Sequence, residues 1–460
     1  MYAAVSGLKA HMSALNVIGN NVSNVNTLGY KATRYTFNEA LYTTTRSGSN
    51  GTNTAGGRNP AQIGFGASIG TIDIDMSTKN YTPTGWGLDT MIDGDGFFLV
   101  GDKVVGADGV SKITLNDITT LKSMNLTRLG RFNIDPNGYL VDGNGQVVWG
   151  FLCMQTSYAY DLSEGGTGAG WNPTGAEGDE ITLPTEGNYK ALSEMTADDI
   201  KKLNSIRKKA GLPELTNVEY TEKMVPDPND ATQLIPDTDD NGNVIMVVKS
   251  ASVPSTDLSA MRMPVLKTIT EMVPAEGDNA DGEYVIPPNP KVRKEVVWVD
   301  PTYLTDGAEV GTLETHPQAD DPEGTEPCRI EYTRLESDSV TIDEKTGALS
   351  IMTSDGTLYT VGYLAIAKVT NPNGVTHVDG RYYQALDGAG NIRVTSVGGA
   401  VAGTETSGDT GLITGGLESS GTDLATEITN MITVQRGYQA NTRIVTVTDS
   451  MLEELVNMKR

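Results

Sequence analysis

The residues that could do chemistry are few and far apart in this sequence. The chain has three histidines, His11, His316 and His377, and none has a neighbour at a spacing typical of metal ligands. Asp93-Gly-Asp95-Gly resembles the start of a calcium loop, but no further ligands with a closing Glu follow, which favours a tight turn. No nucleophile stands beside a recognisable base. The sequence therefore predicts no metal, no cofactor and no enzymatic activity, although abundant Asp and Glu leave a carboxylate pair open.

The two cysteines, Cys153 and Cys328, are too few for a zinc site or a disulfide-dense scaffold. The simpler interpretation is that both are semi-buried apolar side chains, as free cysteines often are. The alternative is one disulfide between them, because both stand near the expected edges of an inserted domain.

Charge excludes several classes of partner. The net charge of −25 argues against a nucleic acid, whose phosphates require a basic surface, and against an anionic membrane. Residues 151–330 hold 14 Lys or Arg against 32 Asp or Glu, a net of −18, whereas residues 417–460 hold 4 against 6, a net of −2. No apolar run reaches about 18 residues, so no transmembrane helix is expected. The N-terminus also lacks the pattern of a secretory signal.

The elements that must position these residues are clearest at the two ends. Apolar side chains recur there at spacings of three and four, which places them on one stripe of a helix, as in the seam of a coiled coil. We call these two sets the predicted stripes and expect them to drive subunit assembly. The N-terminal predicted stripe contains Val5, Leu8, Met12, Leu15 and Val22, with Gly19 between the last two. The C-terminal predicted stripe contains Leu424, Ile428, Met431, Tyr438, Val445, Leu452 and Leu455.

Between the ends, the pattern predicts strands and turns. Pro-Asn-Gly at 136–138 between alternating runs is typical of a hairpin, and Asp142-Gly-Asn-Gly predicts a second one. One internal helix is expected at 197–210, capped by Thr196. The fold class is multidomain α+β, with the N- and C-terminal helices pairing as a coiled coil around nested, mainly-β domains. We expect a helical core domain at 1–29 and 417–460, an extended connecting domain at 30–84, a β domain at 85–150 and 331–416, and an inserted acidic, mainly-β outer domain at 151–330.

Several segments carry a resemblance to a known family. They are residues 1–8, 16–31, 59–64, 92–98, 417–424, 430–441 and 455–460, which run from Met1-Tyr-Ala-Ala-Val-Ser-Gly-Leu to the end at Arg460. Together they resemble the bacterial flagellar axial proteins, the rod and hook family. A rod subunit would lack most of residues 151–330, so the length favours a hook-type subunit over a distal rod protein.

The resemblance implies a self-assembling structural protein. Such subunits form a helical homo-oligomer, a curved hollow tube that passes torque from motor to filament, with terminal helices around the export channel. It implies partners in the rod, the hook–filament junction, the hook cap and the flagellar type III export apparatus. It also implies an extracellular location, reached without a cleaved signal. Some family members cross-link neighbouring subunits through Cys and Lys, which makes Cys153 a candidate.

Two further expectations concern the ends of the chain. The ends should be disordered in the monomer, since their stripes have no partner before assembly. Gly19 could allow the helices to approach closely, or it could merely weaken the helix. The alternatives are another axial component, or a surface protein with a ligand-binding or hydrolytic insert. A pocket in 151–330 that gathers two or three carboxylates would favour the latter.

Overall fold

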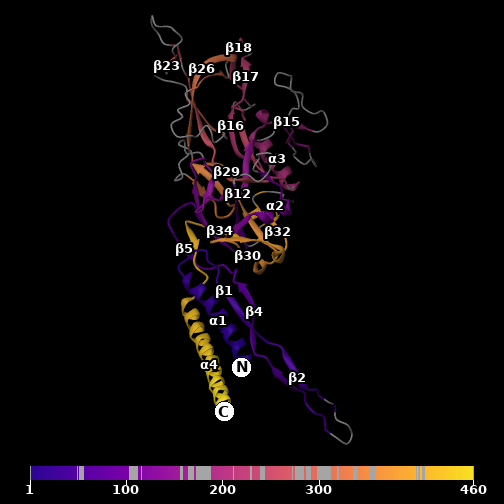
Figure 1. Ribbon diagram of the computed structural model, residues 1–460. Coiled ribbons are helices and arrows are strands. Elements are labelled where there is room, and N and C mark those ends of the chain that lie inside the picture. Colours follow the sequence, from indigo (N-terminus) through magenta and orange to yellow (C-terminus); the bar gives the residue numbers. More distant parts are fainter. Residues whose placement is uncertain are drawn as a thin grey trace. The chain divides into compact units, whose positions relative to one another are not determined.

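A computed structural model describes most of the chain, which divides into two compact units, residues 1–82 with 418–460 and residues 83–417 (Figure 1). The described residues are 2–48, 50, 56–102, 112–115, 117–155, 159–163, 170–171, 188–210, 212–227, 230–238, 244–271, 273–274, 284–285, 292–297, 312–318, 321–334, 340–352, 358–399, 401, 405–406 and 410–458. We call the first the terminal unit and the second the central unit, and describe each by itself.

The terminal unit contains two long helices and two β-ribbons. Helix α1 spans Tyr2–Ser23, and helix α4 spans Leu424–Met458. Strands β1 (Thr33–Glu39) and β4 (Ala67–Ile74) pair antiparallel and lie against α1, and β2 (Tyr42–Arg46) pairs antiparallel with β3 (Ala61–Gly64). None of the described helices combines the length and the hydropathy needed to cross a bilayer.

Local chemistry explains where the terminal helices begin and end. Asn24 donates from its side chain to the carbonyl oxygen of Asn20, which satisfies an end group of α1. Before α4, the Asp423 carboxylate accepts bonds from the Ala425 backbone N–H and the Thr426 hydroxyl, as an N-cap does. These bonds lower the pKa of Asp423. Several threonines farther along α4 donate their hydroxyls back to carbonyls one turn earlier, which accommodates a residue type that is a weak helix former.

The central unit is built on one large, mostly antiparallel network of strands. Its middle strands are β12 (Val147–Gln155) and β29 (Leu358–Val369), which pair with each other. The other strands of the network are β6 (Asp89–Asp93), β7 (Phe97–Gly101), β8 (Lys112–Ile113), β9 (Asn125–Thr127), β10 (Gly130–Ile134), β11 (Leu140–Asp142), β16 (Thr216–Glu222), β19 (Met246–Pro254), β20 (Leu258–Ala260), β27 (Val340–Ile342), β28 (Ala348–Met352), β30 (Thr376–His377), β31 (Tyr382–Gln384), β32 (Ile392–Ser396), β33 (Glu405–Thr406) and β34 (Gly411–Thr414).

The main core lies on this network. It contains apolar residues from 92 to 412, with Phe98 and Phe132 in edge-to-face contact at 5.1 Å between ring centroids. Both predicted hairpins are present: β10 pairs with β11 and β11 with β12, and the turn glycines Gly138 and Gly145 have φ of +82° and +81°. Positive φ is the conformation that glycine adopts without strain, so the sequence signal was a sound one.

A smaller core surrounds the internal helix. Helix α3 spans Ala197–Lys209 and begins with a capping box between Thr196 and Asp199, which confirms the helix expected at 197–210. Its buried residues Ile200 and Leu203 pack with Tyr160 and other apolar side chains. The short helix α2 (Ile118–Ser123) and the strands β13 (Ala159–Asp161), β14 (Gly170–Trp171), β15 (Tyr189–Ala191), β17 (Met224–Asp227) and β18 (Asp230–Pro236) also belong to the central unit.

The acidic segment expected at 151–330 is not one continuous insert. Strand β20 pairs with β12, and Met261 and Met263 lie in the main core. The chain then leaves again for a four-stranded antiparallel sheet in the order β24 (Val292–Val297), β21 (Val265–Glu271), β26 (Asp321–Arg334), β25 (Thr312–Gln318). Pairing with strands more than 100 positions away decides this return, and no local pattern reveals it. The four expected domain boundaries themselves stay predictions.

Candidate assembly surface on the terminal helices

Helices α1 and α4 lie side by side and antiparallel within one chain (Figure 1). A Cβ built on Gly7 would lie 2.7 Å from the Asn441 side chain, and one built on Gly437 would lie 2.8 Å from the His11 ring. Farther along, Asn21 donates to the Glu427 carboxylate at 2.8 Å. Residue numbers therefore rise along one helix as they fall along the other.

Small side chains form the contact surface of α1. Ala and Gly occupy four of its six buried positions, which allows the two backbones to approach closely. The buried positions of α1 are Ala4, Gly7, Ala10, Ala14, Ile18 and Asn21. On α4 the buried residue is Val434, which packs with Ala14 and Ile18. His11 contacts Phe37 of β1 edge-on at 5.4 Å, which is the packing role that its position suggests.

A polar cluster closes the C-terminal end of α1. Asn21 is buried, and its Nδ2 donates to the Thr33 carbonyl oxygen as well as to Glu427. Its Oδ1 accepts from the Thr33 backbone N–H and from the Tyr30 hydroxyl, at 3.0 Å each. Burial raises the pKa of Tyr30. One side chain thus joins α1, the chain that follows it and α4.

The predicted stripes lie mostly outside this contact. Leu15, Val22 and Met431 are partly buried against the small cluster of Ala14, Ile18 and Val434, and Leu8 and Val445 are half-buried. The remaining members, Val5, Met12, Leu424, Ile428, Tyr438, Leu452 and Leu455, are exposed. The intrachain contact of α1 is therefore centred on a neighbouring stripe of mostly small residues and not on the predicted one. Pairing of the two helices as a coiled coil stays a prediction. The role of the predicted stripes between subunits stays a prediction.

Gly19 does not allow a close approach of α1 and α4 within one chain, and a close approach there between subunits stays a prediction. A Cβ built there would meet nothing within 4 Å. The glycines at which α1 and α4 approach closely are Gly7 and Gly437, which sequence reasoning missed. A signal was present, since Ala4, Gly7 and Ala10 recur every third residue. Large apolar residues drew attention away from this second stripe.

The last turns of α4 have no partner on α1. Because Gly7 lies opposite Asn441, the start of α1 at Tyr2 lies opposite about residue 446. Beyond that point α4 continues to Met458. We call residues 447–458 the α4 overhang. Its exposed apolar side chains are Val447, Met451, Leu452, Leu455, Val456 and Met458.

Exposed apolar side chains gather on the terminal unit as a whole. Of 32 large apolar side chains exposed among the described residues, 21 belong to this unit, although it is much the smaller of the two. They include Leu41, Tyr42, Ile63 and Phe65 around the β2–β3 ribbon. A concentration of exposed apolar side chains of this kind is a candidate interaction surface.

Cys153 is a buried free thiol on β12. Burial raises its pKa to about 12, although a hydrogen bond from the Thr216 hydroxyl opposes the shift. A thiol that stays protonated is a poor nucleophile. The backbone of Cys328 lies on β26, but its side chain lies outside the described residues, so the disulfide and the cross-link stay predictions.

The turn at 93–96 connects β6 to β7, as expected. Gly94 and Gly96 have φ of +113° and +140°. The buried Arg128 guanidinium donates to both of their carbonyl oxygens, at 2.8 and 2.7 Å. Arg128 therefore holds the backbone of this turn in place, which agrees with a tight turn. No three His, Cys, Asp or Glu side chains gather into a metal-binding group within the described part of the chain.

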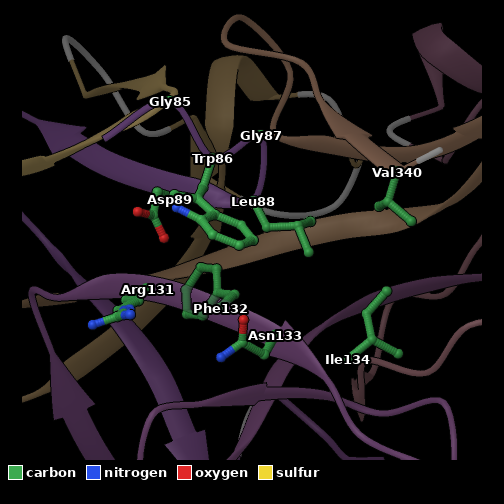
Figure 2. Close-up of a pocket in the computed structure, with 10 residues that line it drawn as sticks. All are labelled: Gly85, Trp86, Gly87, Leu88, Asp89, Arg131, Phe132, Asn133, Ile134 and Val340. Atoms are coloured by element: carbon green, nitrogen blue, oxygen red, sulfur yellow. The ribbon is translucent and has the colours of Figure 1, made fainter. Parts of the chain in front are cut away.

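An open groove of about 520 Å³ lies in the central unit (Figure 2). Its lining comes from residues 85–89, 131–134 and Val340, so it lies outside the acidic segment 151–330. Asp89 is the one carboxylate in that lining, and it accepts a hydrogen bond from the Thr84 hydroxyl at 2.6 Å. This groove does not have the two or three carboxylates that a hydrolytic insert would require.

Comparison with known proteins finds family matches at the two ends of the chain and relatives that align over its full length. Residues 1–31 match the family described as flagella basal body rod protein, and residues 413–458 match the family described as flagellar basal body rod FlgEFG protein C-terminal. The flagellar hook protein FlgE of Borreliella burgdorferi is 25% identical over 100% of this chain and 99% of its own length. This chain is a flagellar hook protein of the rod and hook family.

Other relatives agree with this assignment. The hook protein FlgE of Treponema pallidum is 27% identical over 100% of this chain and 99% of its own length. The basal-body rod protein FlgG of Bacillus subtilis is 41% identical, but over only 32% of this chain and 49% of its own length. The rod protein therefore aligns with only part of this chain, whereas the two hook proteins align with its whole length. The matched families are structural, and the chain is a structural component of the extracellular flagellum.

Proposed function

We propose that this hook subunit polymerises through its terminal unit into a helical, hollow tube that transmits torque from the rod to the filament. The observation that carries the proposal is the gathering of exposed apolar side chains on α1, α4 and the β2–β3 ribbon. A contact between different surfaces of identical subunits that does not close into a ring generates a filament. The exposed members of the N-terminal predicted stripe supply one such surface and the α4 overhang another.

The central unit would form the outer part of the tube. Its acidic segment 151–330 favours repulsion and weak polar contacts, which suits a joint whose outer surfaces must slide as the tube bends. We also propose the partners that the family resemblance implies, namely the rod, the hook–filament junction proteins, the hook cap and the flagellar type III export apparatus. Disorder of the chain ends before assembly stays a prediction.

Electron microscopy of the purified full-length chain under assembly-promoting salt tests the proposal. A matched control is the chain trimmed to residues 83–417, which is the central unit alone. We expect tubes from the first and monomers from the second. Tubes from the trimmed chain would contradict assembly through the ends.

Monomers from both chains would contradict polymerisation itself. In that case the helices would serve only to close one molecule, and the alternatives would return. A distal rod function is less favoured, because the rod relative matches only part of the chain. The groove described above lies outside 151–330, so it gives a hydrolytic insert no support.

A further inference from the structure

A buried ion pair joins the two ends of the terminal unit. Lys31 Nζ lies 2.7 Å from Glu418 Oε1, and the two side chains are 0% and 1% exposed. These residues are 387 positions apart in sequence. Lys31 also donates to the Ser77 carbonyl oxygen at 2.8 Å, and Glu418 Oε1 accepts from the Lys79 backbone N–H at 2.8 Å. Three distant segments therefore meet at one pair of charges.

Backbone hydrogen bonds join two of these segments directly. The Gly29 N–H donates to the Glu418 carbonyl oxygen, and the Gly421 N–H donates to the Tyr30 carbonyl oxygen, at 2.8 Å each. The Ser420 hydroxyl donates to the Asn24 carbonyl oxygen at 2.9 Å. Residues 418–421 thus run beside the chain that leaves α1, a few residues before α4 begins. We call these contacts, together with the ion pair, the clasp.

The charges of the clasp cannot be buried one at a time. Removing a charged side chain from water is costly unless its partner is already in place. Lys31 comes from the N-terminal segment and Glu418 from the C-terminal one, so each segment lacks its counter-charge until the other arrives. Surface ion pairs impose no such condition, because water solvates each partner separately.

We propose that the Lys31–Glu418 clasp makes α1 and α4 order as one all-or-none element. Segment 418–421 positions the chain after α1, and the segment after α1 positions the start of α4. A chain that presents only one of its ends would then leave both helices disordered. In an assembling subunit this prevents a partly available chain from offering half of its assembly surface. The assembly readout below rests on the proposed function, whereas the exchange readout does not.

The test is hydrogen–deuterium exchange of the α1 peptides in the full-length chain. The variants are Lys31→Met, Glu418→Gln and the double variant, which removes both charges while the new amide at position 418 keeps an oxygen for the Lys79 N–H. The unmodified chain is measured first, both soluble and pelleted. All variants are then compared in the state in which the α1 amides of the unmodified chain are protected from exchange. The control is Asp75→Asn, which breaks a pair of the same 2.7 Å length whose side chains are 24% and 36% exposed.

We expect each single variant to raise the opening equilibrium of α1 roughly 100-fold or more, and the control to change it by at most about fivefold. The double variant should be milder than the product of the two single effects. The clasp proposal is overturned if Glu418→Gln loses protection only at residues 416–424 while α1 stays protected. It is also overturned if the effects of the two single substitutions are additive in the double variant. A failure of α1 to be protected in either state of the unmodified chain would overturn it as well.

The critical concentration for assembly, measured on the same variants, separates the two proposals. If the unmodified chain never pellets, the proposed function is wrong. The hydrogen–deuterium exchange of the single and double variants still tests the clasp in that case. If the unmodified chain pellets, and the Glu418→Gln variant pellets equally well with α1 still protected from exchange, only the clasp proposal is wrong.

Discussion

Replacing Leu452 and Leu455 by Gln should weaken assembly without affecting the folded subunit. Both residues lie on the α4 overhang and are 47% and 61% exposed in the single chain. Gln has a helix propensity close to that of Leu, so α4 itself should be preserved. The substitutions therefore remove only the apolar surface that a neighbouring subunit would bury.

The expected magnitude follows from that exposure. Burying a Leu side chain fully contributes about 1.5–3 kcal/mol, so the roughly half that remains exposed is worth about 1 kcal/mol for each residue. The double variant should lose about 2 kcal/mol of assembly free energy per subunit, which raises the critical concentration about 30-fold. Sedimentation at a series of total concentrations measures this value.

A matched control exists in the central unit. Met352 and Leu358 are paired across β28 and β29 and are 54% and 58% exposed. Changing both to Gln removes a similar exposed apolar area and should leave the critical concentration unchanged. The reasoning is refuted if Leu452→Gln/Leu455→Gln assembles at the concentration of the unmodified chain, or if the control is affected equally.

Three further predictions concern packing and reactivity. Gly437→Ala should destabilise the helix pair by about 1 kcal/mol, because its Cβ would lie 2.8 Å from the His11 ring, whereas Gly19→Ala meets nothing and should gain about 1 kcal/mol; thermal unfolding followed by helical circular dichroism checks both, and equal gains would contradict the packing. Cys153, with its pKa near 12, should react with iodoacetamide at pH 8 roughly a thousandfold more slowly than a free cysteine, and fast labelling of the folded chain would disprove this. Gly130→Ala should destabilise the central unit by about 3 kcal/mol in urea unfolding, because its Cβ would overlap a carbonyl oxygen of β6; a loss below about 1 kcal/mol would show that the strands can separate there.

The pattern of the sequence was most informative where structure depends on near neighbours. Thr196 and Asp199 stand three residues apart, and that spacing alone specifies the capping box that begins α3. Gly138 likewise specifies its hairpin, because the turn requires a positive φ that other residues rarely adopt. The presence of a helix at each end of the chain could also be predicted, because apolar side chains recur there at helical spacing.

The same pattern could not say which face of α1 meets α4. Periodicity ranks large apolar residues first, so it selected Val5 and Met12, which the single chain leaves exposed. The intrachain contact instead uses Gly7 and Ala14, because two antiparallel backbones approach most closely where side chains are small. The two stripes are neighbours on one helix, and only the packing distance decides between them.

The sequence by itself determined the element types, the apolar ends and the family, since each depends on residues close together in the chain or on matched segments. The tertiary structure decided the contacts between distant residues: the return of Met261 to the main core, the register of α1 against α4, and the meeting of Lys31 with Glu418. Their physical basis is the burial of apolar area and of paired charge. Both depend on which segments are brought together, and no local spacing records that.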